Sequence, residues 1–184
     1  AVLADSTFAD CFALDVGTSY TMSDGTTRRV DEKVFNGQTL RGVTEIWGTD
    51  PDFTDYVQVG DGYIAFPGSE TYGPAPMIFL SPNNRIPDNA VPGQAINLNY
   101  QETRLPANVT TTESYVTYFI GFETLTLGGK TFANTCHFRT PDEDNPGETW
   151  NIWFANGYGT IREEQQDAQG NLIGFSNKLT AVMP

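Results

Sequence analysis

Few side chains in this 184-residue chain have the types and spacing that nucleophilic catalysis requires. His137 is the only histidine, and no Gly-x-Ser-x-Gly sequence marks a nucleophile on a strand-to-helix turn. Ser69, in PGSETYG, comes nearest but lacks that spacing. A structural histidine, hydrogen-bonded or exposed, is therefore the better interpretation of His137. The sequence predicts no catalytic residue and a protein that is not an enzyme.

Carboxylates are plentiful, but their pattern does not define an acid pair. Glycoside hydrolysis uses two carboxyl groups held about 5–10 Å apart across a cleft. Most of the 23 acids fall in apparent turns, where a sequence cannot show that two of them converge. Glu123 lies inside a strand pattern, where we expect it to face solvent. A carbohydrate-active hydrolase that uses Asp or Glu stays open as an alternative.

Metal and cofactor sites are poorly supported. The two cysteines lie far apart without the Cys-x-x-Cys spacing of zinc and thioredoxin-type sites. DPDFTDYVQVGD places Asp50, Asp52, Thr54 and Asp61 at calcium-ligand positions of a twelve-residue loop, but Asp55 stands where an EF-hand needs glycine. We therefore interpret this segment, and PDEDNPGE at 141–148, as solvated acidic loops. No glycine-rich phosphate loop opens a helix, and we predict no metal and no cofactor.

Aromatic residues are the strongest candidates for a binding face. The stretch WNIWFANGYGTIREE, residues 150–164, contributes Trp150, Trp153 and Tyr158, and Trp47 lies elsewhere. Together these four could stack on a sugar or line a cavity. On one strand, Trp153 would face opposite to Trp150, so we favour core packing of a strand covered on both sides. A bend would follow at glycines 157 and 159.

Charge limits the partners. The formal net charge is −13 and only ten residues are Lys or Arg, which excludes nucleic acid as a reasonable partner and disfavours an anionic membrane surface. No stretch has the roughly 18 apolar residues of a transmembrane helix. AVLADSTFADC lacks the basic start and the apolar run of a signal peptide. The chain opens at Ala rather than Met, which suggests a processed or trimmed chain, and we expect an exported protein whose signal has been removed.

Hairpin signals recur along the chain. Asp24-Gly25, Asn36-Gly37, Asp61-Gly62 and Gly128-Gly129 each lie between runs of β-branched and aromatic residues, and 167–174 offers a looser turn. These signals predict an all-β fold of about nine to eleven antiparallel strands in meander order, curved into a barrel or half-barrel. Alternation along 132–138 directs Cys136 to the core and His137 away from it.

The middle of the chain has a different composition. Seven of the eleven prolines lie between Pro67 and Pro106, and proline cannot donate to a β-ladder. We predict a Pro-rich, loop-rich crossing segment over 67–106 rather than a run of central strands, with Ile78 and Leu80 packed onto the sheet.

Three segments in order carry a resemblance to a family. CFALDVGTSYTM (11–22), LTLGGKTFANTCHF (125–138) and IWFANGYGTIREE (152–164) resemble the opening, the glycine-turn hairpin and the Trp-aromatic-Ala-x-Gly-x-Gly signature of exported bacterial β-proteins, many of them lipoproteins, described as DUF3108-like or TapB-like. PMIFLSP…VPGQAI is similar to their Pro- and Gly-Gln-containing segment. Thr18, Tyr20 and Asn156 depart from the family's usual Asn, Trp and Pro. The resemblance implies a curved antiparallel sheet and no catalytic residues.

These observations together predict a single β domain spanning residues 1–184, located in the periplasm or outside the cell, with an upstream lipid anchor as a further expectation. In such a compartment we expect Cys11 and Cys136 to form a disulfide, the alternative being two buried thiols. The function expected is non-enzymatic binding of an apolar molecule, a glycan or an envelope protein. A purely structural or assembly role in the envelope is the alternative.

Overall fold

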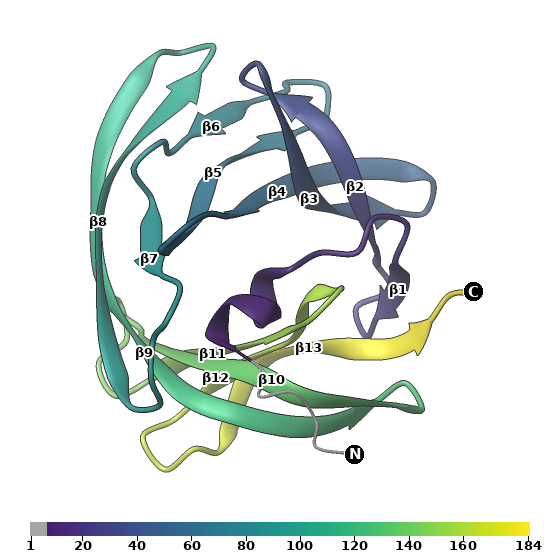
Figure 1. The fold of residues 1–184 in the computed structure, drawn as a ribbon, viewed down its shortest axis with the longest axis vertical. Coiled ribbons are helices and arrows are strands. Elements are labelled where there is room, and N and C mark those ends of the chain that lie inside the picture. Colours follow the sequence, from purple (N-terminus) through teal and green to yellow (C-terminus); the bar gives the residue numbers. More distant parts are fainter. Residues whose placement is uncertain (1–6) are drawn as a thin grey trace.

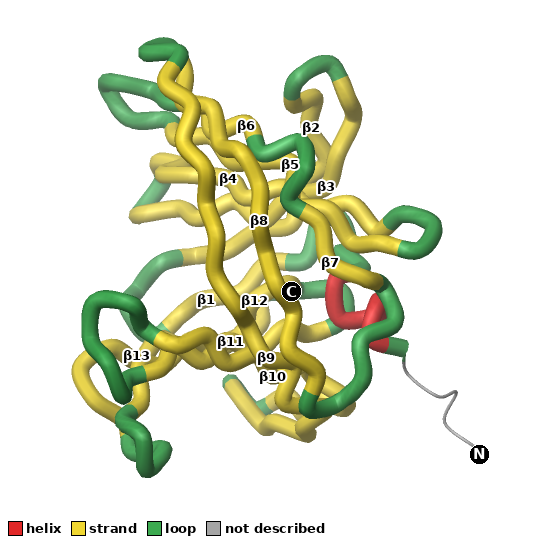
Figure 2. Tube along the Cα trace, turned by 90° about the vertical axis from the view of Figure 1, so that its left-hand side faces the viewer, coloured by secondary structure: helices red, strands yellow, loops and turns green. Residues whose placement is uncertain are grey.

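The computed structural model describes residues 7–184. Residues 1–6, the first part of the segment AVLADSTFADC, lie outside the described part. The described chain is almost entirely β-structure (Figures 1 and 2). Its elements are η1 (Phe8–Phe12), β1 (Ser19–Met22), β2 (Thr27–Phe35), β3 (Gln38–Trp47), β4 (Asp50–Val59), β5 (Tyr63–Thr71), β6 (Ile78–Leu80), β7 (Arg85–Pro87), β8 (Gln94–Leu105), β9 (Val109–Leu127), β10 (Lys130–Pro141), β11 (Thr149–Ala155), β12 (Gly159–Gln166) and β13 (Leu172–Val182).

Twelve strands of the described residues form a closed antiparallel barrel. The order around it is β4-β3-β2-β1-β13-β12-β11-β10-β9-β8-β6-β5, and pairing of β5 with β4 closes the ring, while β7 pairs with β5 outside it. Most neighbours are also consecutive in the chain. The predicted antiparallel meander and barrel are confirmed. The strand number exceeds the predicted range because three turns and two short strands were not foreseen.

The predicted hairpin turns are present and explain much of the register. At the β2–β3 turn, Asn36 and Gly37 have φ angles of 46° and 76°, and Phe35 pairs directly with Gln38. Gly128 and Gly129 at the β9–β10 turn also have positive φ. Such angles match the twist of two-residue hairpins. Turns at Gly48 and around Pro106 complete the meander and carried weaker signals.

The Pro-rich segment differs from the prediction in its second half. Residues 67–93 do contain short strands and loops, but 94–105 form β8, which pairs with β9 over eleven residues. The flanking prolines Pro92 and Pro106 lie outside that strand, so its ladder donors remain intact. Ile78 and Leu80 belong to barrel strand β6 itself, and Ile78 is exposed rather than packed onto the sheet.

The stretch 150–164 is two strands and not one bent strand. β11 and β12 pair as a hairpin whose turn lies around Asn156 and Tyr158. Gly157 and Gly159 both have φ of +81°, a conformation that favours glycine. The two glycines therefore reverse the chain direction at this point, whereas the sequence had predicted a bend in a single strand.

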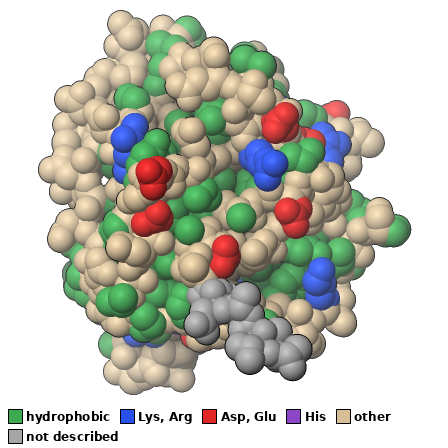
Figure 3. Space-filling model, in the orientation of Figure 1, with side chains coloured by type: hydrophobic (Ala, Val, Ile, Leu, Met, Phe, Trp, Pro, Cys, Tyr) green, Lys and Arg blue, Asp and Glu red, His purple; other side chains and the backbone are tan. Residues whose placement is uncertain are grey.

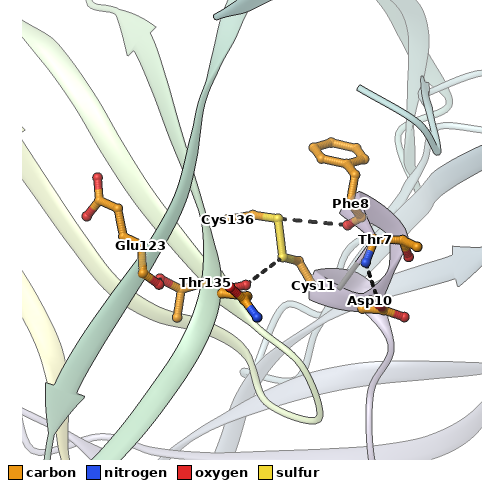
Figure 4. Close-up of a disulfide and its surroundings, with 8 residues drawn as sticks. Thr7, Phe8, Asp10, Cys11, Glu123, Thr135 and Cys136 are labelled. Carbon is orange, nitrogen blue, oxygen red and sulfur yellow. Dashed lines mark hydrogen bonds between the residues drawn. A yellow bond between two sulfur atoms is a disulfide. The ribbon is translucent and has the colours of Figure 1, made fainter. Parts of the chain in front are cut away.

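One part of the barrel interior is filled by the N-terminal 3₁₀ helix. In Figure 1 η1 lies inside the ring of strands, and Figure 4 shows Cys11 joined to Cys136 on β10. The predicted disulfide is confirmed, with a Cα–Cα distance of 5.9 Å. Phe8 and Phe12 pack against Phe138, and Phe8 also contacts Phe119 edge-on. We call η1 with its disulfide and these four rings the plug.

Candidate functional site

The rest of the barrel interior contains a cavity of about 660 Å³. One part of its wall is aromatic, and another part carries charged side chains. The aromatic wall includes Phe53, Phe66, Phe79, Tyr100, Phe154 and Phe175. The charged wall includes Asp24, Arg28, Glu45, Asp55, Glu102 and Glu163. A largely apolar cavity with a few placed polar groups is the usual form of a small-molecule site.

Strand register brings the charged residues to one face. Arg28 on β2 pairs directly with Glu45 on β3, and two residues along β3 Val43 pairs with Asp55 on β4. Asp55 in turn pairs with Ser69 on β5. Because directly paired residues of an antiparallel sheet share a face, these side chains form a continuous band across four strands inside the barrel.

Arg28 is the centre of a buried ionic cluster. Its guanidinium lies 3.2 Å from Glu45 Oε2 and 2.9 Å from Glu163 Oε1, and it donates to the Thr160 carbonyl. Burial by itself would lower the pKa of Arg28, but Glu163 above all, with Tyr20 and Glu45, raises it. The single guanidinium in the cavity wall is therefore already paired with two carboxylates.

Glu45, a member of this cluster, and its neighbour Tyr20 have pKa values raised by burial. Desolvation raises the pKa of Glu45, although Arg28 acts in the opposite direction. Desolvation also raises the pKa of Tyr20, whose hydroxyl donates to the carbonyls of Tyr158 and Thr160. Both groups are held in place by the protein and are not free to bind another molecule.

Asp55 is in a different situation from the paired acids. Its side chain is accessible to water from the cavity, yet the surrounding protein desolvates it and raises its pKa to about 6. Arg28 lowers this pKa, whereas the charges of Glu163 and Glu45 raise it further. No hydrogen bond or ion pair joins the Asp55 carboxylate to any other side chain or backbone group of residues 7–184.

A second acceptor in the cavity wall is also unpaired. The Oδ1 atom of Asn84 is buried and accepts no hydrogen bond from the described residues. Unpaired buried polar atoms are uncommon, because leaving one costs about 1–3 kcal/mol. Because Asn84 Oδ1 has almost no accessible surface, the acceptor that the cavity offers without a donor is the Asp55 carboxylate.

The four aromatics proposed as a ligand face are not brought together. Trp47 is exposed at the end of β3, and Trp150 is partly exposed and packs against Phe175 of the cavity wall. Trp153 and Tyr158 are buried in a separate cluster. Burial of Trp153 agrees with the core interpretation, and a ligand role for the four stays a prediction.

His137 lies on the face opposite to Cys136, as alternation predicts, but it is buried and not exposed. It stacks on Trp153 with 4.2 Å between ring centroids, and its Nδ1 and Nε2 lie 2.7 Å and 2.8 Å from Glu123 and Asn151. Glu123, expected to face solvent, also accepts a hydrogen bond from Trp153. Both ring nitrogens are thus occupied by structural partners, consistent with a structural histidine.

The calcium alternative is not supported by the backbone. The segment that begins the twelve-residue pattern forms strand β4, so Asp50, Asp52 and Thr54 are spread along an extended chain at roughly 3.3 Å per residue. Within residues 7–184, no group of three or more His, Cys, Asp or Glu side chains is arranged to hold a metal ion.

The charged cavity residues were missed from the sequence, although one signal was present. A two-residue turn at Asn36-Gly37 fixes the β2–β3 register, which makes Arg28 the direct partner of Glu45. An opposite-charge pair at that spacing could have been inferred. Glu163, Asp55 and Asn84 carry no such local signal. Asp55 reaches this face through the β3–β4 register, which contains a bulge between Glu45 and Ile46, and Glu163 on β12 reaches it only through barrel closure.

Comparisons with known proteins give no family. No family model, curated protein or solved structure matches the chain. The resemblance to exported bacterial β-proteins accordingly stays a hypothesis. The described residues contain no helix long and apolar enough to cross a membrane.

Proposed function

We propose that this protein is a non-enzymatic binding protein that holds a small molecule inside its barrel, and that it works in the periplasm or outside the cell. The cavity of about 660 Å³, with its aromatic wall and its unpaired Asp55 carboxylate, carries this proposal. The volume lies within the range of about 300–1,000 Å³ that small-molecule sites occupy. The Cys11–Cys136 disulfide supports export, because disulfides persist in oxidising compartments.

Filling the cavity tests the proposal. Ser69 lines the cavity between Asp55 and Phe79, so Ser69→Phe should place a ring in the space a ligand would occupy. Nile red, a neutral apolar dye, should gain fluorescence with the wild-type protein and lose at least tenfold in affinity for Ser69→Phe. Ser114→Phe, the same change at an exposed position on β9, is the matched control and should bind as wild type does.

Two results would count against a binding role. Equal dye binding by Ser69→Phe and wild type, with unchanged circular dichroism, would place the dye elsewhere. If the proposal holds, mass spectrometry of the protein isolated from its natural source should reveal a co-purified small molecule. Absence of both dye binding and a co-purified molecule would instead favour the structural or assembly alternative.

Glycoside hydrolysis is a second candidate because of one observation. Asp55, with a pKa raised to about 6, could donate a proton in mildly acidic solution, where a large fraction of this carboxyl group is protonated. The second carboxylate that this reaction needs is not available in an unpaired form, since Glu45 and Glu163 are both bonded to Arg28. We therefore expect no release of nitrophenol from nitrophenyl glycosides between pH 4 and pH 8; release that Asp55→Asn abolishes would favour the hydrolase.

A further inference from the structure

The charge balance of the cavity wall indicates which small molecules fit it. Five carboxylates and one guanidinium line the cavity. Arg28 is taken up by Glu45 and Glu163, and Glu102 is bonded to Arg104, 3.0 Å away. An anionic ligand would therefore meet no free cation and would face several negative charges.

The hydrogen-bond partners of the cavity carboxylates also argue against an anionic ligand and favour one with donors. Asp24 is satisfied by Asn177 and by the backbone and hydroxyl of Thr26, which leaves the Asp55 carboxylate as the acceptor that faces the cavity without a donor from the described chain. A ligand that carries an N–H donor would satisfy it. A ligand that is also positively charged would offset the repulsion that Glu45 and Glu163 exert on ionised Asp55.

The aromatic part of the cavity wall indicates the chemistry of the uncharged part of the ligand, its body. Rings such as Phe53, Phe66 and Phe79 offer apolar surface and the negative π-faces that attract ammonium groups. In the face shown in Figure 3, hydrophobic side chains occupy the centre, and both acidic and basic side chains lie around them. A bare metal ion would not use this apolar surface, and it lacks the required cluster of three ligands in residues 7–184.

We infer that the ligand is an organic ammonium compound with an apolar or aromatic body, whose charged nitrogen binds at Asp55. This inference rests on the proposed binding function and names the ligand class of the same cavity. Asp55 provides the charge, and the aromatic wall provides the contact with the body of the ligand.

Three compounds with one apolar body and different heads test the inference: naphthylethylamine, naphthylethanol and naphthylacetate. By titration calorimetry at pH 7.5, the amine should bind at least tenfold more tightly than the alcohol, and the carboxylate most weakly. Asp55→Asn should lower the affinity for the amine about tenfold and change that for the alcohol less than twofold. Asp52→Asn, an equal change in net charge at an exposed position of the same strand, should leave the amine unaffected.

The pH dependence of the wild-type protein gives a test that needs no variant. The amine stays protonated from pH 5 to pH 8, so its affinity should fall as Asp55 gains a proton below about pH 6. The charged groups that act on Asp55 are Arg28, Glu45 and Glu163. Binding of the alcohol should not follow this profile, and neither should amine binding to Asp55→Asn.

Failure of the inference can be told from failure of the proposed function. Equal binding of amine and alcohol, or an equal loss in Asp55→Asn and Asp52→Asn, overturns the ammonium assignment while cavity binding stands. If Ser69→Phe also binds Nile red as wild type does, the cavity itself is not the binding site, and both proposals fail.

Discussion

The plug and the cavity, the two parts of the barrel interior, differ in how completely side chains fill them. In the plug, η1 inserts Phe8 and Phe12 among aromatic strand residues and is fixed by Cys11–Cys136. In the cavity, space remains and Asp55 and Asn84 Oδ1 lack partners. The plug is thus built for stability, whereas the cavity retains groups that cost stability, as binding sites commonly do.

Removing the disulfide of the plug should have the largest effect on the free energy of unfolding. The pair Cys11→Ser and Cys136→Ser opens a crosslink between residues 125 apart in sequence, which the chain-entropy model values at about 4–5 kcal/mol. Urea unfolding of the double variant should show a loss of that size. A loss below about 1 kcal/mol would mean that ring packing alone fixes η1.

Truncating a plug ring should have the next largest effect. Phe8 is buried and contacts Phe12, Phe119 and Phe138, so Phe8→Ala should lower the free energy of unfolding by about 3–5 kcal/mol. Trp47→Ala, at an exposed position on β3, should change it by less than about 0.5 kcal/mol. Comparable losses in the two variants would contradict the description of the plug as a core.

The attachment of the plug to the β11–β12 turn should contribute less. Gly157 donates to the Ala13 carbonyl and accepts from the Asp15 amide, its φ is +81°, and a Cβ there would lie 2.6 Å from Asp15 Oδ2. Gly157→Val should cost about 1–3 kcal/mol through backbone strain. A melting temperature equal to that of wild type would show that the turn adapts freely.

The smallest effect should come from a substitution in the cavity, which should raise the free energy of unfolding instead of lowering it. The pKa of Asp55 is raised from 3.8 to about 6 in the folded state, so ionisation there opposes folding, and stability falls as pH rises from about 4 to about 6. Asp55→Asn removes that cost and should stabilise the protein by about 1–2 kcal/mol at pH 7.5, less than a fully buried carboxyl would give because the side chain is accessible to cavity water. The gain should vanish near pH 4; a gain that persists there would assign it to another cause.

What the sequence determined by itself was local. Asn-Gly, Asp-Gly and Gly-Gly turns have backbone angles that few other residues adopt, so they specified hairpins and, at Asn36-Gly37, the exact pairing of Arg28 with Glu45. Alternation likewise placed Cys136 on the inner face and His137 on the other. These are preferences of neighbouring residues and do not depend on how the barrel closes.

Only the tertiary structure decided what the interior contains. Pairing of β1 with β13, the insertion of η1, and the proximity of Asp55 to Arg28 and Glu163 all bring together residues distant in the chain. Proline content suggested loops over 94–105, but pairing with β9 made that segment a strand. The environment that gives Asp55 its raised pKa exists only when strands β2, β3, β4 and β12 surround one space, because desolvation and charge–charge interaction depend on distance in the folded molecule and not on separation in sequence.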